Sequence, residues 1–257
     1  MIPALIGVIH LQPLPGSPRY RGRLDEIVEA ARADASALAA AGFDAALVEN
    51  FGDAPFFPNE VDAVTVAAMT RCALAVREAA PKLALGINVL RNDARAALAM
   101  ALASEASFVR INVHVGARVT DQGILEGHAH RTLRLRQELR LDDRVKLLCD
   151  VAVKHSAPLA PRPIEEEAQE AVERGLADAI LVTGAATGAP ASRSDLDAVL
   201  AAVKVPVLVA SGVTGDTLAA IAGAHGVVVG SALRASGRAG DAVDAERARA
   251  FSRAFRS

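Results

Sequence analysis

The chain has 257 residues, 52% of them hydrophobic, and it carries a formal net charge of −2 with a sequence pI near 6.3. A chain of this length and apolar content can bury a large core as one domain, residues 1–257, and is not expected to be disordered. The near-neutral charge argues against a nucleic-acid-binding protein, which would usually present a basic face.

Cysteine usage and the apolar segments indicate a soluble, cytoplasmic protein. Cys72 and Cys149 lie far apart in the sequence, which is typical of reduced, buried thiols rather than of a disulfide framework. The apolar segment 1–9 has no basic region and no cleavage-like site, so we interpret it as a first strand and not as a signal peptide. No apolar run approaches the roughly 18 residues that a spanning helix needs, and we expect no stable membrane insertion.

Apolar runs without polar alternation are typical of strands buried on both faces of a parallel sheet. Eight such runs alternate with segments of helical periodicity, the clearest of which places Leu24, Ile27 and Ala31 on one face before a stop at Gly42. The eight alternations predict an α/β protein with a single (β/α)8 TIM barrel, and an open doubly wound sheet is the alternative. The predicted strands are 5–10, 44–49, 83–89, 107–113, 145–153, 178–183, 206–210 and 226–230, and the later helices are roughly 59–79, 92–105, 122–140, 162–175, 193–203, 215–223 and 240–254.

Polar and apolar residues alternate in the fourth and fifth predicted strands. Arg110, Asn112 and His114 share one parity in the fourth, and Asp150 and Lys154 share one in the fifth. Because the apolar parity must face the helices, the polar side chains should point into the barrel. An unpaired buried charge costs several kcal/mol. We therefore predict that Arg110 and Asp150, on adjacent strands, contact each other.

Further polar residues stand at the carboxyl ends of the predicted strands, the face that holds the active site in this fold. Each has a structural alternative: His10 as a capped core histidine, Glu49 as the partner of an interior arginine, and Lys154 as an exposed rim charge. We predict that Glu49 or Asp150 acts as a base. His10, Lys154 or His155 would act as acid or electrophile, since a partly dry barrel mouth moves pKa values towards neutrality. The candidate catalytic residues are His10, Glu49, Asn88, Arg110, Asn112, Asp150 and Lys154.

Two other chemistries are weaker alternatives at these positions. Lys154 could form a Schiff base, although nothing near it in the sequence demands a lowered pKa. His10, Glu49 and Asp150 have the side-chain types of metal ligands, but their spacing matches no metal motif. We predict neither a metal site nor a cofactor.

The last two predicted strands end abruptly at Ser-Gly and Gly-Ser turns. Such turns expose backbone N–H groups that can bind phosphate, and the loops after strands seven and eight often hold a phosphate in this fold. The segment 181–188 repeats 208–215 with four of eight residues identical, which either adds a third phosphate loop or reflects two ordinary turns. We predict a small phosphorylated ligand. The candidate phosphate-binding residues are Thr183, Gly184, Ser211, Gly212, Gly230 and Ser231.

The loops 12–20 and 50–59, after the first two strands, contain four of the eight aromatic residues. Exposed aromatic side chains on a loop usually contact a ligand or a partner subunit. These loops could form a wall of the ligand site, a contact in a homo-oligomer or a hydrophobic plug over the barrel mouth.

Five longer motifs cover these strand ends: GVIHLQPLPGSP at 7–18, VENFGDAPF at 48–56, GINVLRND at 86–93, FVRINV at 108–113 and DVAVKHS at 150–156. They resemble the BtpA family, and the resemblance extends over nearly the whole chain. It implies a barrel similar to the ribulose-phosphate-binding class. That family is named after a cyanobacterial factor for photosystem I biogenesis and also has members in non-photosynthetic prokaryotes. Its chemistry is not settled, so the resemblance assigns no catalytic roles.

Two functions from different classes follow. The phosphate turns and polar interior favour an enzyme that acts on a small phosphorylated metabolite, by isomerisation, carbon–carbon or glycosidic-type chemistry. The resemblance suggests instead a non-catalytic biogenesis or stability factor for photosystem I or another membrane complex. Against the second, the segment 241–255 has arginines but few bulky apolar residues, unlike an amphipathic membrane helix. We favour the enzyme.

Overall fold

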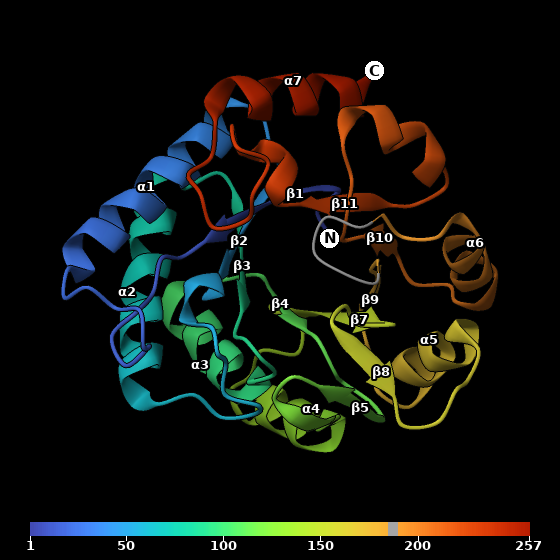
Figure 1. Ribbon diagram of the computed structural model, residues 1–257. Helices are drawn as coiled ribbons and strands as arrows, with labels where there is room; N and C mark the ends of the chain where they lie inside the picture. The colour runs from blue at the N-terminus through green and yellow to red at the C-terminus, as the bar shows by residue number, and fades with distance from the viewer. Residues whose placement is uncertain (185–189) are drawn as a thin grey trace.

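Eight parallel strands close into a barrel inside a ring of helices in the computed structural model, which describes residues 1–184 and 190–257 (Figure 1). This arrangement confirms the predicted TIM barrel. The order around the barrel is β1-β11-β10-β9-β7-β4-β3-β2. The bounds are Leu5–His10 for β1, Ala45–Glu49 for β2, Ala84–Asn88 for β3, Phe108–Ile111 for β4, Lys146–Val151 for β7, Ala179–Val182 for β9, Val207–Val209 for β10 and Gly226–Val229 for β11.

The helices cover the outside of the barrel through apolar faces. In α1, the buried positions include Ile27, Ala31 and Leu38, and the chain leaves the helix at Gly42, whose φ of +79° suits a residue without a Cβ. The α-helices are α1 (Leu24–Ala40), α2 (Ala63–Ala79), α3 (Ala94–Ser104), α4 (Ala129–Glu138), α5 (Ile164–Glu173), α6 (Arg193–Ala202) and α7 (Ala245–Arg256), and the short 3-10 helices are η1 (Phe51–Asp53), η2 (Gly215–Ile221) and η3 (Ser231–Leu233). In the described part of the chain no helix is both long and apolar enough to cross a membrane.

Two apolar cores lie on either side of the barrel wall. The larger one fills the space between strands and helices, and a smaller one, which includes Ile6, Leu47 and Phe108, fills the barrel interior. Phe108 fits because the neighbouring residue on β3 is Gly86: a Cβ there would lie 2.1 Å from the Phe108 ring. The lower part of the barrel is therefore a packed core and not a channel.

The predicted helix 122–140 is wrong in its first part, because residues 123–126 form a strand. This strand, β6 (Gly123–Glu126), pairs with β5 (Ala117–Thr120), which also pairs with β8 (Ser156–Pro158) in a small antiparallel sheet. Leu125 is buried with Val113 and Val153, whereas its neighbour Ile124 is exposed. The alternation thus has the period of a strand, and α4 begins only at Ala129.

The predicted helix 215–223 is shorter than expected and has 3-10 geometry. It begins after Thr214, where the Thr214 and Thr217 side chains form a reciprocal capping box, and it precedes Gly223, whose φ is +93°. The chain between β10 and β11 therefore makes only a brief helical connection.

Candidate active site

The inward-facing side chains of the barrel strands are apolar until the carboxyl end, where polar residues follow in the same alternation. On β1, the interior residues Ile6 and Val8 are followed on the same face by His10. On β2, Leu47 is followed in the same way by Glu49. Apolar packing therefore ends in one layer, and a polar layer begins above it. The sequence alternation had predicted this change for the fourth and fifth barrel strands.

The strand register brings the first polar residues together. His10 pairs with Glu49, Glu49 with Asn88, and Asn88 with Arg110 along four consecutive strands. Asp150 on β7 lies one layer further out, because Arg110 is in register with Leu148. Neighbouring strands are about 4.8 Å apart, so these side chains form a continuous arc across the mouth of the barrel.

A cavity of about 490 Å³ opens above this arc. Its lining includes Glu49, Arg110 and Lys154, and the turns at Gly212 and Gly230 also contribute. A volume of this size suits a small metabolite. Charged side chains and glycine turns therefore meet in one space.

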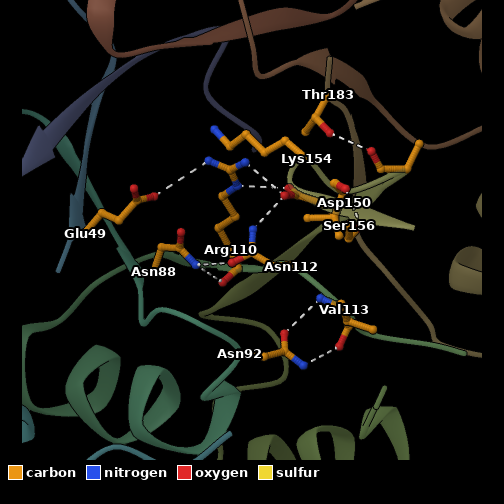
Figure 2. Close-up of polar contacts among 12 residues, drawn as sticks. Glu49, Asn88, Asn92, Arg110, Asn112, Val113, Asp150, Lys154, Ser156 and Thr183 are labelled. Atoms are coloured by element: carbon orange, nitrogen blue, oxygen red, sulfur yellow. Dashed lines mark hydrogen bonds and ion pairs between the residues drawn. The ribbon is translucent and has the colours of Figure 1, made fainter. Parts of the chain in front are cut away.

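Arg110 and Asp150 form a bidentate ion pair at the cavity floor (Figure 2). Nε and Nη2 of Arg110 donate to the two carboxylate oxygens of Asp150, each over 2.9 Å, and Nδ2 of Asn112 donates to Oδ2 over 2.7 Å. Both charged side chains are at most 3% exposed. The predicted contact between Arg110 and Asp150 is confirmed, and the Asp150 carboxylate accepts three hydrogen bonds, two from Arg110 and one from Asn112.

Glu49 is held more loosely. Its Oε2 lies 3.8 Å from Nη1 of Arg110, and its Oε1 lies 3.9 Å from Nε2 of His10. Both distances exceed a hydrogen bond, so the carboxylate is attracted by the charge of Arg110 without being tied to one donor. Figure 2 shows it pointing from β2 towards the Arg110 guanidinium. Of the two candidate bases, Glu49 keeps more of its acceptor capacity.

His10 has a defined tautomer. Its Nδ1 accepts from the backbone N–H of Gly240 over 3.3 Å and faces Nη2 of Arg234 at 3.2 Å. Since both neighbours are donors, Nδ1 carries no proton, and the neutral ring carries its hydrogen on Nε2. Burial, followed by the charges of Arg234, Lys154 and Arg110, holds the pKa of His10 well below its usual value. His10 therefore presents a neutral N–H donor on the side of Glu49.

Lys154 follows the end of β7 and lines the cavity. Its side chain extends alongside the Arg110 guanidinium (Figure 2). Burial lowers the pKa of Lys154, and the Arg110 charge lowers it further. This direction agrees with the shift expected at a partly dry barrel mouth, and its causes, the barrel wall and Arg110, come from other parts of the chain. His155, next to it, is exposed at the rim.

The predicted phosphate residues fall into two groups. Ser211, Gly212, Gly230 and Ser231 all line the cavity. Thr183 instead donates its hydroxyl to the Ala152 carbonyl oxygen over 3.0 Å. Neither Thr183 nor Gly184 is among the described residues of the lining. Residues 185–188 of the repeated segment lie outside the described residues.

Two other sequence candidates are placed behind the cavity wall. Asn88 is buried, and its Nδ2 donates to the Arg110 carbonyl oxygen over 3.1 Å and approaches Oδ1 of Asn112 at 3.4 Å. His114, expected to point into the barrel, instead lies outside it, with Nε2 2.7 Å from the Gly175 carbonyl oxygen. That expectation was wrong because β4 ends at Ile111, so the alternation no longer holds three residues later.

Sequence reasoning missed three arginines near the site. Arg91 and Arg19 line the cavity, and the fully buried Arg234 contacts His10 behind it. Arg91 lies three residues after the end of β3. It would have been a candidate if every polar residue just after a predicted strand had been considered. From the two aromatic loops, Phe51 and Phe56 form part of the cavity wall.

Metal ligation receives no support from side-chain clustering. Within residues 1–184 and 190–257, no three His, Cys, Asp or Glu side chains gather in an arrangement that could hold a metal ion. His10 and Glu49 contribute to the cavity, but Asp150 is directed at Arg110.

Comparison with known sequences identifies the family. The BtpA family model matches residues 1–257. The chain belongs to the BtpA family. The photosystem I biogenesis protein BtpA of Synechocystis sp. is 45% identical over 251 residues, which are 96% of this chain and 86% of that protein. An uncharacterized protein of Thermococcus kodakarensis is 46% identical over 246 residues, covering 95% of this chain and 92% of that protein.

Solved structures resemble this BtpA-family chain in fold alone. N-(5'-phosphoribosyl)anthranilate isomerase from Pyrococcus furiosus has a TM-score of 0.60 at 12% identity, and the match covers 98% of each chain. (S)-3-O-geranylgeranylglyceryl phosphate synthase from Thermoplasma acidophilum, solved with its substrate sn-glycerol-1-phosphate, has a TM-score of 0.58 at 16% identity, covering 98% and 93%. The BtpA barrel thus has neighbours among enzymes of phosphorylated metabolites.

Proposed function

We propose that this protein is an enzyme that acts on a small phosphorylated metabolite, with the phosphate bound at the turns after β10 and β11. The observation that carries the proposal is the composition of the cavity. Gly212 and Gly230 lie in its wall together with Glu49 and Lys154. A phosphate subsite next to a carboxylate and an amine is what proton transfer on a phosphorylated substrate requires.

Glu49 is the base in this proposal. Asp150 is already engaged by three hydrogen bonds, whereas the Glu49 carboxylate has contacts of 3.8 and 3.9 Å only, to Arg110 and His10. In an isomerisation, Glu49 would take a proton from the carbon next to a carbonyl group. The electron pair of the broken C–H bond would form a C=C bond, and the π electrons of the carbonyl group would move onto its oxygen. Glu49 would then return the proton to carbon.

His10 and Lys154 would stabilise that oxygen. A neutral Nε2–H donor suits a developing oxyanion, because a fixed donor in a dry site stabilises charge that appears only in the transition state. The lowered pKa of Lys154 brings its ammonium group closer to the range in which it can also give up a proton. The isomerase and synthase neighbours support the phosphorylated substrate class by fold only.

The name of the Synechocystis relative favours a second candidate, a biogenesis or stability factor for photosystem I or another membrane complex. On this alternative, the cavity would bind no metabolite, and the protein would be recovered with subunits of a membrane complex. Affinity purification from the native host, followed by identification of bound proteins, tests it. The polar cavity favours the enzyme.

Thermal shifts with sugar phosphates, each beside its dephosphorylated counterpart, test the proposed function. A ligand at about 100 times its Kd adds about 2.7 kcal/mol, or roughly 5–10 °C in Tm for a chain of this size. Ser231→Asp should abolish the shift by placing a negative charge in the phosphate turn, and Ser231→Asn, of similar size and neutral, should retain it. Equal shifts for a phosphorylated compound and its dephosphorylated form would contradict the proposal.

A further inference from the structure

Arg110, Arg91 and Lys154 all line the cavity, but only Arg110 has a close carboxylate. Arg110 is paired with Asp150 and lies 3.8 Å from Glu49. Arg91 and Lys154 line the same cavity, and no carboxylate of residues 1–184 or 190–257 lies within 4.0 Å of either. A cation removed from water without a counterion is costly, so the missing partner is expected in a ligand.

Arg91 is the more strongly constrained of the two. It is 5% exposed, and its Nη2 donates to the Lys154 carbonyl oxygen over 2.7 Å. Its buried Nε has no hydrogen-bond partner in the described part of the chain. Burial lowers the pKa of Arg91, although the guanidinium remains charged. A planar guanidinium with an unused N–H donor suits an oxyanion.

The position of Arg91 is opposite the phosphate turns. In the closed strand order, β3 is four strands from β10 in either direction, and β4 is four strands from β11. Arg91 follows β3 and reaches the loop after β7, so it crosses the end of β4. An anion at Arg91 would therefore be separated by the width of the barrel mouth from a phosphate at Gly212 or Gly230.

We propose that the cavity contains a second anion subsite at Arg91, next to Lys154. The substrate is then a small molecule with a phosphate at one end and a second oxyanion at the other. The second group is a carboxylate or another phosphate. The two ends of the substrate bind at opposite walls of the cavity, and the middle of the substrate lies over Glu49. This inference rests on the proposed function and adds the class of substrate to it.

Isothermal titration calorimetry with matched ligands tests the second subsite. Each phosphorylated sugar acid (glycerate, erythronate, ribonate and gluconate phosphate) is compared with the polyol phosphate of the same carbon chain. The two differ only in a terminal carboxylate or CH2OH group. At the chain length that spans the cavity, the acid should bind about tenfold or more tightly, as expected for one charge-assisted contact. A bisphosphate of that length shows whether phosphate is accepted as well.

Three variants of the full-length chain separate the subsites. Arg91→Met should remove the preference for the acid and leave binding of the polyol phosphate unchanged, which also shows that the variant is folded. Arg91→Lys, which keeps the charge, should retain part of the preference. Arg95→Met removes an exposed arginine of α3 whose nearest ion pair is Glu60 at 3.9 Å, and it should behave like the wild type.

The outcomes distinguish this inference from the proposed function. If acid and polyol phosphates bind equally at every length, or if the preference survives in Arg91→Met, the second subsite is disproved and the phosphate site stands. If no phosphorylated compound binds, the proposed function fails and the second subsite fails with it.

Discussion

Nη2 of Arg234 lies 3.2 Å from Nδ1 of His10 and donates to the Val8 carbonyl oxygen over 2.8 Å. Arg234 is fully buried, and its Nε and Nη1 have no hydrogen-bond partner among the described residues. Arg234 therefore contacts the Nδ1 side of the His10 ring, opposite the Nε2 side that faces Glu49. The surrounding burial and the Arg234 charge both disfavour a second proton on His10 and so lower its pKa.

The tautomer of His10 follows from this contact. We expect long-range ¹H–¹⁵N spectra at neutral pH to show a neutral His10 ring protonated on Nε2. The substitution Arg234→Met should raise the pKa of His10 towards the usual value of about 6.5, because one positive neighbour is lost. Arg238→Met, at an exposed arginine four residues later, is the control. A ring protonated on Nδ1 in the wild type would contradict the assignment.

The free energy of unfolding should decrease as the pH is lowered, because of the same histidine. Below about pH 6.5 the unfolded chain binds a proton at His10 that the folded chain does not, so the free energy of unfolding decreases by up to about 1.4 kcal/mol per pH unit. His10→Asn, whose Oδ1 can replace Nδ1 as an acceptor, should flatten this dependence in urea unfolding between about pH 6.5 and 5.

His114 also has a pKa lowered by burial and adds to the same slope. The effect of His10 is therefore the difference between wild type and His10→Asn at each pH. His130→Asn, on the exposed side of α4, is the control. Parallel curves for wild type and His10→Asn would rule out a proton-linked role for His10.

Breaking the Arg110–Asp150 pair should be strongly destabilising. Asp150→Asn leaves the Arg110 guanidinium buried with only the more distant Glu49 carboxylate, and a buried pair broken at one side typically costs about 3–5 kcal/mol. Asp25 pairs with Arg71 on the surface, where the side chains are 84% and 54% exposed, respectively. Asp25→Asn should therefore leave stability close to the wild type. Urea unfolding of both variants checks this, and equal losses would contradict it.

Glu49→Gln should preserve folding and strongly reduce turnover. If Glu49 is the base, the amide cannot accept the proton, and kcat should fall about 100- to 10,000-fold on a substrate found by thermal shift. Glu60→Gln, at a carboxylate that is 70% exposed, is the matched control. Unchanged turnover in Glu49→Gln would show that another group is the base.

Gly86→Ala should destabilise the barrel interior. The new Cβ would lie 2.1 Å from the Phe108 ring, and overpacking of this kind costs about 1–3 kcal/mol. The smaller side chain of Phe108→Leu should recover part of the loss in the double variant. Gly215→Ala, where the nearest atom would be 3.9 Å away, should be close to neutral. Thermal unfolding of the four proteins measures the coupling, and additive losses would show that the two positions do not interact.

Local pattern was sufficient to predict much of this protein. Strand alternation depends only on the two-residue period of the backbone. It therefore correctly predicted that Arg110 and Asp150 contact each other. The same reasoning failed at His114, because it assumed that the strand continued beyond Ile111. The prediction from helical periodicity failed at residues 123–126, where pairing with β5 decides between strand and helix.

The sequence by itself determined the barrel, its family resemblance and most of the polar residues at its mouth, because each of these is encoded in a continuous segment. Only the tertiary structure decided how those residues act. The state of His10 depends on Arg234 and Gly240, more than 200 positions away in the chain. The lowered pKa of Lys154 depends on burial and on Arg110, and the place of Arg91 depends on barrel closure. Charge, desolvation and hydrogen bonding act through space, so they become defined only when distant segments meet.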